Sequence, residues 1–276
     1  MTFGVAVDFM LAPHRIPDKY ADWNREHHAP FGRRGRRLIE TFGPRNRAVA
    51  RYLGPYSWQK NNSLRAFEYP WAYEQLAELG ERLSVIDVGA GLAGLQFSLG
   101  QAGHAVHAVD PGMAARGRGW DLDPDQHAFL ADVYRAPVTL HPTTLAGAGM
   151  ADDSVDAVVS ISAIEHFAEE DLAEFARETR RVVRPGGHVV LTIDLFLDLD
   201  PFTSRSHNEY GTNFDVKRLL DHVGATLIKG EPATLFGYPE FDPDRLQSNL
   251  SEYLVGTMYP ALVQCVVARV DGAARP

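Results

Sequence analysis

The stretch Val85–Gly94 constrains the fold more than any other part of this 276-residue chain. It reads VIDVGAGLAG, so an apolar run of β-type residues leads into three glycines, and helix-forming residues follow. Gly89 and Gly91 permit a tight turn and close contact between backbone and ligand, and Gly94 lets the helix pack on the strand. We predict a strand, a turn and a helix that together bind a flat, polar cofactor. The glycines alone do not name that cofactor.

Short β-rich runs alternate with helical stretches from about residue 84 onward. The helical stretches, 92–101, 164–183 and 214–223, carry apolar residues at intervals of three and four. This alternation predicts an α/β fold, a mostly parallel sheet with helices on both faces. The expected strands are 84–88, 105–109, 138–140, 157–161, 188–193, 226–228 and 262–267.

Residues 1–66 differ from this core because they are polar, rich in arginine and interrupted by five prolines. We expect them to form short helices that make a helical N-terminal lid, with the catalytic core at 67–270. Two long loops, 195–213 and 231–260, interrupt the core. Long ordered loops on an α/β core more often carry function than not, so we predict that both contact the substrate.

Two acidic residues narrow the choice of cofactor. Asp110 follows the second strand, sixteen residues after Gly94, where a carboxylate can accept hydrogen bonds from both ribose hydroxyls. NAD and S-adenosylmethionine both carry that ribose. Asp87 lies two residues before the first glycine, where a fixed negative charge suits an ammonium or sulfonium ion better than a pyrophosphate. Asp87 therefore favours S-adenosylmethionine.

Charge and composition exclude other classes. The net charge is −9, but residues 1–51 hold ten Lys and Arg against five Asp and Glu. An acidic body argues against a long nucleic-acid footprint. The single cysteine, Cys265, allows no internal disulfide, and neither a signal peptide nor an uncharged run long enough to span a membrane is present. We expect a cytoplasmic monomer or homodimer with no membrane partner.

Five segments in order give the chain a family resemblance over about residues 80–270. The chain resembles the class I S-adenosylmethionine-dependent methyltransferases of the small-molecule type. The resemblance implies a Rossmann-like sheet of seven strands with the last, at 262–267, antiparallel, and S-adenosylmethionine as cofactor. The segments are VIDVGAGLAG at 85–94, VDP at 109–111, DDSVDAVVS at 152–160, EHF at 165–167 and RVVRPGGHVVL at 181–191.

The resemblance also implies where the cofactor binds. Its methionyl part would lie beside the glycine turn and its ribose at the tip of the second strand. Residues that follow the fourth strand would line the rest of the cofactor site. The family often has an acid for the adenine amine where this chain has Thr144, with Met150 in place of a phenylalanine. Thr144 and the backbone at Leu145 are therefore expected to hold adenine. The expected cofactor-binding residues are Asp87, Gly89, Ala90, Gly91, Gly94, Asp110, Pro111, Thr144, Leu145, Ser160 and Ile161.

Methyl transfer requires alignment of donor and acceptor, an amine acceptor must be neutral, and a hydroxyl acceptor benefits from a base. His166 and Asp194 are the catalytic candidates, because they follow the fourth and fifth strands, although His166 equally fits a structural tie between helix and sheet. Substrate contacts are expected from an aromatic segment before the core and from the loop 195–213, whose arginine can clamp a carboxylate. No metal site is expected. The substrate candidates are Tyr69, Trp71, Arg205, His207 and Tyr210.

The sequence thus predicts methyl transfer from S-adenosylmethionine to an oxygen or nitrogen atom of a small metabolite. A carboxylate-bearing compound of specialised metabolism is one candidate substrate. Two alternatives stay open. An RNA or protein methyltransferase would use the arginine-rich segment 33–37, and a nicotinamide-dependent oxidoreductase would use the same glycine turn.

Overall fold

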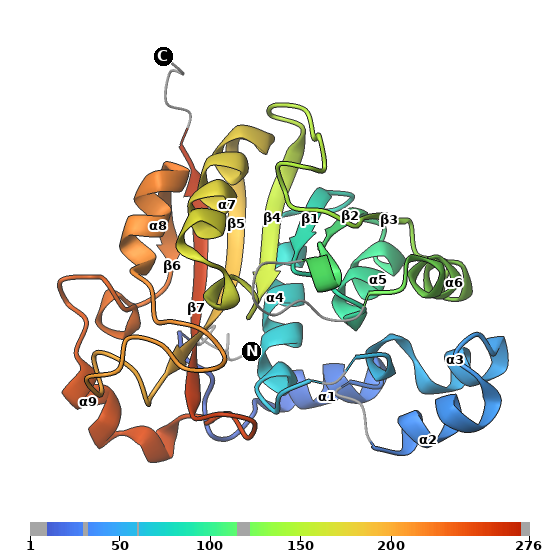
Figure 1. Cartoon of the computed structure of the whole chain (residues 1–276), viewed down its shortest axis with the longest axis horizontal. Helices are drawn as coiled ribbons and strands as arrows, with labels where there is room; N and C mark the ends of the chain where they lie inside the picture. Colours follow the sequence, from blue (N-terminus) through green and yellow to red (C-terminus); the bar gives the residue numbers. More distant parts are fainter. Residues whose placement is uncertain (1–9, 30–32, 60, 115–121, 272–276) are drawn as a thin grey trace, which may run out of the picture.

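A seven-stranded sheet forms the centre of the protein, with the strand order β3-β2-β1-β4-β5-β7-β6 (Figure 1). The computed structural model describes residues 10–29, 33–59, 61–114 and 122–271, without the side chains of residues 33–36 and 114. β7 is antiparallel to both neighbours and the other strand pairs are parallel, which confirms the predicted Rossmann-like sheet. The strands are β1 (Ser84–Val88), β2 (Ala105–Val109), β3 (Val138–His141), β4 (Val155–Ile161), β5 (Val183–Phe196), β6 (Ala225–Lys229) and β7 (Ala261–Val270).

Helices cover both faces of the sheet because successive strand residues point to opposite sides. Val85 and Val159 pack against α4 and α5 on one face, whereas Ile86 and Val158 pack against α7 and α8 on the other. α6 lies beside α5 and β3 (Figure 1). The helices of the two faces are α4 (Arg65–Leu79), α5 (Gly94–Gln101), α6 (Pro124–Tyr134), α7 (Glu169–Val182) and α8 (Val216–Val223).

The strand order reverses between β1 and β4, and in open α/β sheets ligands bind at such a point, beyond the carboxyl ends of the strands. Four further helices lie below the sheet in the view of Figure 1, at the lower ends of its strands. These helices are α1 (Asp18–Glu26), α2 (Arg33–Phe42), α3 (Arg47–Leu53) and α9 (Pro243–Ser248).

Two elements differ from the sequence prediction. The helix expected over 164–183 is divided into a short 3₁₀ turn, Ile164–His166, and α7, which begins at Glu169. Acidic residues fill the first turn of α7, as the positive end of the helix dipole favours. β5 begins at Val183, earlier than expected, because the RPGG segment forms a bulge within it: the register moves from Val155 opposite Val183 to Ala157 opposite His188.

The N-terminal segment is joined to the core at several points. α1 to α3 are short helices, as predicted, but α4 begins at Arg65, so the expected boundary at residue 66 lies inside its first turn. Ahead of α1, Leu11 forms an antiparallel bridge with Gln264 of β7. Further along, the Tyr56 ring is enclosed against Gly94 at the start of α5. Gly94 was expected to serve helix–strand packing, but the atoms nearest to an added Cβ belong to Tyr56.

Substitution of Gly94 tests its contact with Tyr56. A Cβ at residue 94 would lie 2.5 Å from ring atoms of Tyr56, which is 1% exposed. We expect Gly94→Ala to lower the free energy of unfolding by about 1–3 kcal/mol through overpacking. Urea unfolding would measure this loss in the wild-type and Tyr56→Ala backgrounds. An equal loss in both backgrounds would contradict the contact with Tyr56.

Candidate functional site

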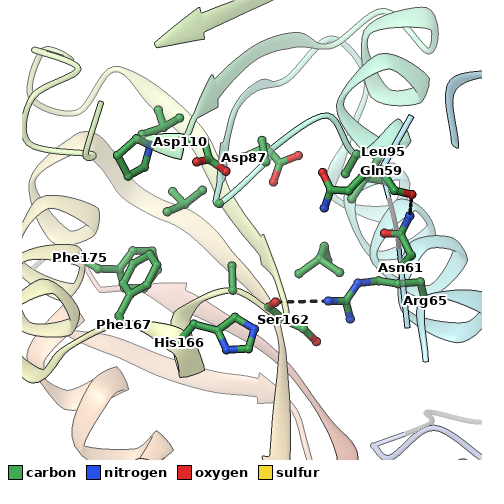
Figure 2. Close-up of a pocket in the computed structure, with 18 of the residues that line it drawn as sticks. Gln59, Asn61, Arg65, Asp87, Leu95, Asp110, Ser162, His166, Phe167 and Phe175 are labelled. Carbon is green, nitrogen blue, oxygen red and sulfur yellow. Dashed lines mark hydrogen bonds between the residues drawn. The ribbon is translucent and has the colours of Figure 1, made fainter. Parts of the chain in front are cut away.

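A cavity of about 630 Å³ lies at the carboxyl ends of β1, β2 and β4 (Figure 2). The core and the N-terminal segment both contribute to its wall, which includes Gln59, Asn61 and Arg65. The predicted site residues that line the cavity are Tyr69, Asp87, Gly89, Ala90, Asp110, Pro111, Thr144, Leu145, Ile161, His166 and Tyr210. Within the described part of the chain, the predicted residues that do not line it are Trp71, Gly91, Gly94, Ser160, Asp194, Arg205 and His207.

The glycine turn after β1 forms one side of the cavity. Gly89 and Gly91 have φ values of +74° and +49°, in the left-handed region that favours glycine. A Cβ on Gly89 would collide with Ala163, and a Cβ on Gly91 would collide with the Gln59 amide. The Gln59 Oε1 atom also accepts a hydrogen bond of 2.8 Å from the Leu92 backbone N–H. The turn is therefore enclosed by residues distant in sequence.

Asp87 and Asp110 lie close together at the ends of β1 and β2 (Figure 2), and both are buried. Backbone N–H groups of Gly91 and Gly112 donate hydrogen bonds of 2.8 and 2.7 Å to the Asp110 carboxylate. Burial raises the pKa of Asp110, and these two bonds oppose that rise. For Asp87, burial and then the charge of Asp110 raise the pKa to about 8. A cation bound here would lower that pKa and be held by the carboxylate.

A mostly apolar part of the cavity follows β3 and the 3₁₀ turn Ile164–His166. Leu145 is buried there, and Phe167 and Phe175 belong to the same apolar cluster and line the same cavity. The Thr144 hydroxyl oxygen accepts a bond of 3.3 Å from the Gly147 N–H, so it belongs to a local turn. Its aromatic and aliphatic side chains suit an aromatic base. Ser160 instead donates to the Val88 carbonyl at 2.9 Å and ties β4 to β1.

A polar wall lies opposite the two aspartates, with Ser162 and His166 at the bottom of Figure 2. We call Tyr69, Ser162, His166, Tyr210 and Tyr259, all of which line the cavity, the His166 wall. The Nδ1 atom of His166 donates to the Tyr210 carbonyl, which makes Nε2 the proton-accepting nitrogen of the neutral ring. The Tyr210 and Tyr259 rings lie 4.3 Å apart. The wall therefore presents an imidazole and several phenols.

Buried carboxyl groups lie behind the His166 wall. Glu68 of α4 accepts from Ser162, from the Thr192 hydroxyl at 2.7 Å and from the Arg65 guanidinium. Asp194 accepts from the Tyr259 hydroxyl at 2.6 Å and contacts the Ser162 hydroxyl at 3.1 Å. Asp194 is 1% exposed, so it acts on the cavity through these two residues. This arrangement joins α4 to β4 and β5.

Glu165 extends the buried group of acids. Its Oε1 atom accepts a bond of 3.4 Å from the Asp194 N–H, and among the described residues nothing donates to its buried Oε2 atom. Burial, followed by the charge of Asp194, raises the pKa of Glu165 well above its usual value. Burial, followed by the charge of Glu68, raises the pKa of Asp194. The interior behind the wall therefore carries an excess of acidic groups over the Arg65 guanidinium.

The loop 195–213 places its predicted residues in different surroundings. Tyr210 lines the cavity, whereas Arg205 is exposed and pairs with Asp198 at 3.1 Å. His207 is also exposed and contacts the Ser206 hydroxyl at 3.2 Å. The carboxylate clamp expected at Arg205 is therefore not formed in this structure. Among the described residues, no group of three or more His, Cys, Asp and Glu side chains is arranged to hold a metal ion.

Several residues of the site were not predicted. They come from the N-terminal segment, from α4, and from the segments after β4 and before β7. Glu68 alone had a visible signal, a charged residue inside the aromatic run FEYPW, which indicates a buried charge that needs partners. The residues missed are Gln59, Asn61, Arg65, Glu68, Ser162, Met258 and Tyr259.

Comparisons with known proteins agree with this geometry. Residues 86–191 match the family model described as methyltransferase domain. The fold is similar to the [4+2]-cyclase SpnF, at 14% identity and a TM-score of 0.51 over 86% of this chain and 95% of that one. It is equally similar to the YcgJ protein of Bacillus subtilis, at 14% identity and a TM-score of 0.51 over 74% and 98%. At this identity the similarities show the fold alone, and a fold does not fix a reaction.

A third solved structure covers nearly the whole chain. It is the 1,6-didemethyltoxoflavin-N1-methyltransferase of Burkholderia thailandensis, at 16% identity and a TM-score of 0.49 over 95% of each chain. No curated protein sequence matches the chain.

Asp87 makes binding of the predicted cofactor pH-dependent. With a pKa of about 8, Asp87 is protonated in the empty protein at pH 6 and must lose that proton to pair with an ammonium ion. We expect the affinity for S-adenosylhomocysteine to rise about tenfold per pH unit between pH 6 and 7 and to level off above pH 8. Calorimetry in buffers of different ionisation enthalpy would also detect the released proton.

The Asp87→Asn variant tests whether Asp87 has opposite effects on the stability of the empty protein and on cofactor affinity. The raised pKa means that Asp87 stabilises the empty protein at low pH and loses this contribution as pH rises through 8. The empty Asp87→Asn variant should therefore unfold at a higher temperature than the wild type at pH 8, yet bind S-adenosylhomocysteine more weakly. Asp221→Asn, at an exposed ion pair on α8, should alter neither property. Retained pH dependence in Asp87→Asn would refute the assignment.

Proposed function

Because the chain belongs to the class I S-adenosylmethionine-dependent methyltransferases, with a methyltransferase domain over residues 86–191, we propose which class of acceptor it methylates and which residues bind the cofactor and the acceptor. The chain is an enzyme, and its cofactor is S-adenosylmethionine. We propose that the enzyme methylates an oxygen or nitrogen atom of a metabolite held against the His166 wall. The position of His166 across the cavity from Asp87 and Asp110 carries this proposal (Figure 2).

The residues around the glycine turn fit the cofactor. Asp87 supplies a buried carboxylate for its ammonium group, and the Asp110 oxygens, each already bonded to one backbone N–H, keep a lone pair for a ribose hydroxyl. Adenine would lie near Thr144 and Leu145 beside Phe167 and Phe175. The bound cofactor supplies a methyl group on a sulfonium. Three features support this fit: the charge of Asp87, the hydrogen-bonding capacity of Asp110, and the glycine turn, where a side chain would collide with its neighbours.

His166 would act as the base for the acceptor atom. Its Nδ1–H bond to the Tyr210 carbonyl fixes the ring orientation and the tautomer, so Nε2 accepts a proton from a hydroxyl or an ammonium group. Asp194 would position Tyr259 and Ser162 rather than touch the acceptor, because it is enclosed behind them. The surrounding aromatic residues limit access of water, which favours alignment of the reacting groups.

The charges of the cavity favour a neutral or cationic metabolite. Arg205, the residue expected to clamp a carboxylate, is paired with Asp198, and Arg65 is paired with Glu68. The cavity wall also contains Asp87, Asp110 and two acids of α7. A carboxylate-bearing substrate therefore has less support than the sequence alone gave it, and a role in specialised metabolism stays a prediction.

The alternatives have less support. A nicotinamide-dependent reaction is excluded by the cofactor, S-adenosylmethionine. For an RNA or protein substrate, the arginine-rich segment 33–37 has only its helical backbone and the Arg37 side chain among the described residues, so this alternative stays a prediction. None of the described helices is both long and apolar enough to span a membrane. The cytoplasmic location and the monomeric or homodimeric state also stay predictions.

Transfer of tritium from methyl-labelled S-adenosylmethionine to a panel of phenols, amines and carboxylic acids tests the proposal. With the best acceptor, His166→Asn keeps an N–H donor for the Tyr210 carbonyl but removes the proton-accepting Nε2. We expect the turnover number to fall by about 10²–10⁴-fold, because general-base catalysis typically contributes that much. S-adenosylhomocysteine binding should stay unchanged.

His222→Asn is the matched control, since His222 is exposed on α8 and does not line the cavity. It should keep wild-type turnover. Transfer to RNA or protein but to no small molecule would disprove the proposed substrate class. Full activity in His166→Asn would remove the base from the mechanism without affecting the cofactor assignment.

A further inference from the structure

Three hydroxyl groups of the His166 wall, those of Tyr69, Ser162 and Tyr259, donate their protons to neighbouring protein groups. Tyr259 donates to Asp194 at 2.6 Å, and Tyr69 donates to the Asn61 amide oxygen at 2.7 Å. Ser162 donates to Glu68. A hydroxyl has only one proton, so these oxygens can only accept further hydrogen bonds. A ligand that hydrogen-bonds to these three oxygens must therefore supply the donors.

His166 follows the same pattern. Its Nδ1–H is donated to the Tyr210 carbonyl, so Nε2 is the ring nitrogen that can accept a proton. One of the two amide N–H groups of Asn61, another lining residue, is donated to the Gln59 carbonyl at 2.7 Å. A group with several N–H or O–H donors can hydrogen-bond to these acceptor atoms. A carboxylate has only acceptor oxygens, so it cannot.

The charge behind the wall has the same preference. Glu68, Asp194 and Glu165 are buried there, and the guanidinium of Arg65 neutralises only one of them, Glu68, by direct contact. A cation at the wall reduces the cost of keeping the other acids ionised. The rings of Tyr69, Tyr210 and Tyr259 also line the cavity, and aromatic faces attract ammonium ions.

We propose that the substrate is a small organic amine, bound as its ammonium ion against the His166 wall. This inference rests on the proposed function and names the substrate class of that site. With the amine nitrogen as acceptor, one ammonium proton moves to Nε2 of His166, and the freed lone pair forms the new N–C bond. The S–C bond breaks with its electrons going to sulfur, so a sulfonium becomes a neutral thioether and the product is a methylated ammonium.

Matched probes of opposite charge test the inference. Two pairs of similar shape are 2-phenylethylamine with 3-phenylpropanoate, and benzylamine with phenylacetate. Each is titrated by calorimetry at pH 7.5 into the full chain saturated with S-adenosylhomocysteine. We expect both amines to bind at least tenfold more tightly than their carboxylate partners. Equal or tighter binding of the carboxylates, or no binding by any of the four probes, overturns the inference.

Tyrosine variants test the role of the wall oxygens. Tyr259→Phe keeps the ring and removes the oxygen, so amine binding should weaken at least fivefold while S-adenosylhomocysteine binding stays within error. The melting temperature of this variant should fall, because the buried Asp194 carboxylate loses a donor. If S-adenosylhomocysteine binding also changes, Tyr69→Phe decides the question by the same measurements. Tyr52→Phe, at a residue 72% exposed on α3, is the matched control and should bind amines like the wild type. Unchanged amine binding in the deciding wall variant overturns the inference.

Failure of this inference differs from failure of the proposed function. Tritium transfer to a phenol or a carboxylic acid, with no transfer to an amine, would keep the methyltransferase function and overturn the amine class. Transfer to no small molecule would overturn both.

Discussion

The burial of carboxyl groups at the end of a parallel sheet is the constraint on which this site depends. A carboxylate loses favourable hydration when it leaves water, and only hydrogen bonds or a nearby cation restore it. Asp110 and Glu68 receive backbone, hydroxyl or guanidinium donors. Within the described structure Asp87 receives no hydrogen bond of this kind, and burial together with the charge of Asp110 raises its pKa. The same burial that weakens the empty protein therefore strengthens the binding of a cationic cofactor.

The N-terminal segment completes the site rather than merely covering it. Tyr56 packs on Gly94, Gln59 bonds the backbone after the glycine turn, and Arg65 and Tyr69 contribute to the cavity wall. Because α4 begins at Arg65 and also holds Glu68 behind the His166 wall, one helix connects the lid, the sheet and the substrate side of the cavity. The cofactor and acceptor regions consequently share structural support.

Local signals in the sequence were sufficient for much of the fold and for part of the site. The strands were found because Val- and Ile-rich runs must be buried on both faces, and β1 and β2 match their predicted bounds. Gly89 and Asp110 were found because a strand followed by a turn fixes their positions within a few residues. Where the local pattern was ambiguous, as in the helix expected over 164–183, packing around His166 and Phe167 divided the element.

The sequence by itself determined the parallel sheet, the glycine turn and the positions of the two aspartates at the strand ends, because each depends on neighbours a few residues away. Only the tertiary structure decided the substrate side. Ser162 meets Glu68 across 94 residues of sequence, and Tyr259 meets Asp194 across 65. It also showed that Arg205 pairs with Asp198 instead of facing the cavity. Hydrogen-bond direction and charge pairing between distant segments are set by packing, and no local pattern of residues encodes them.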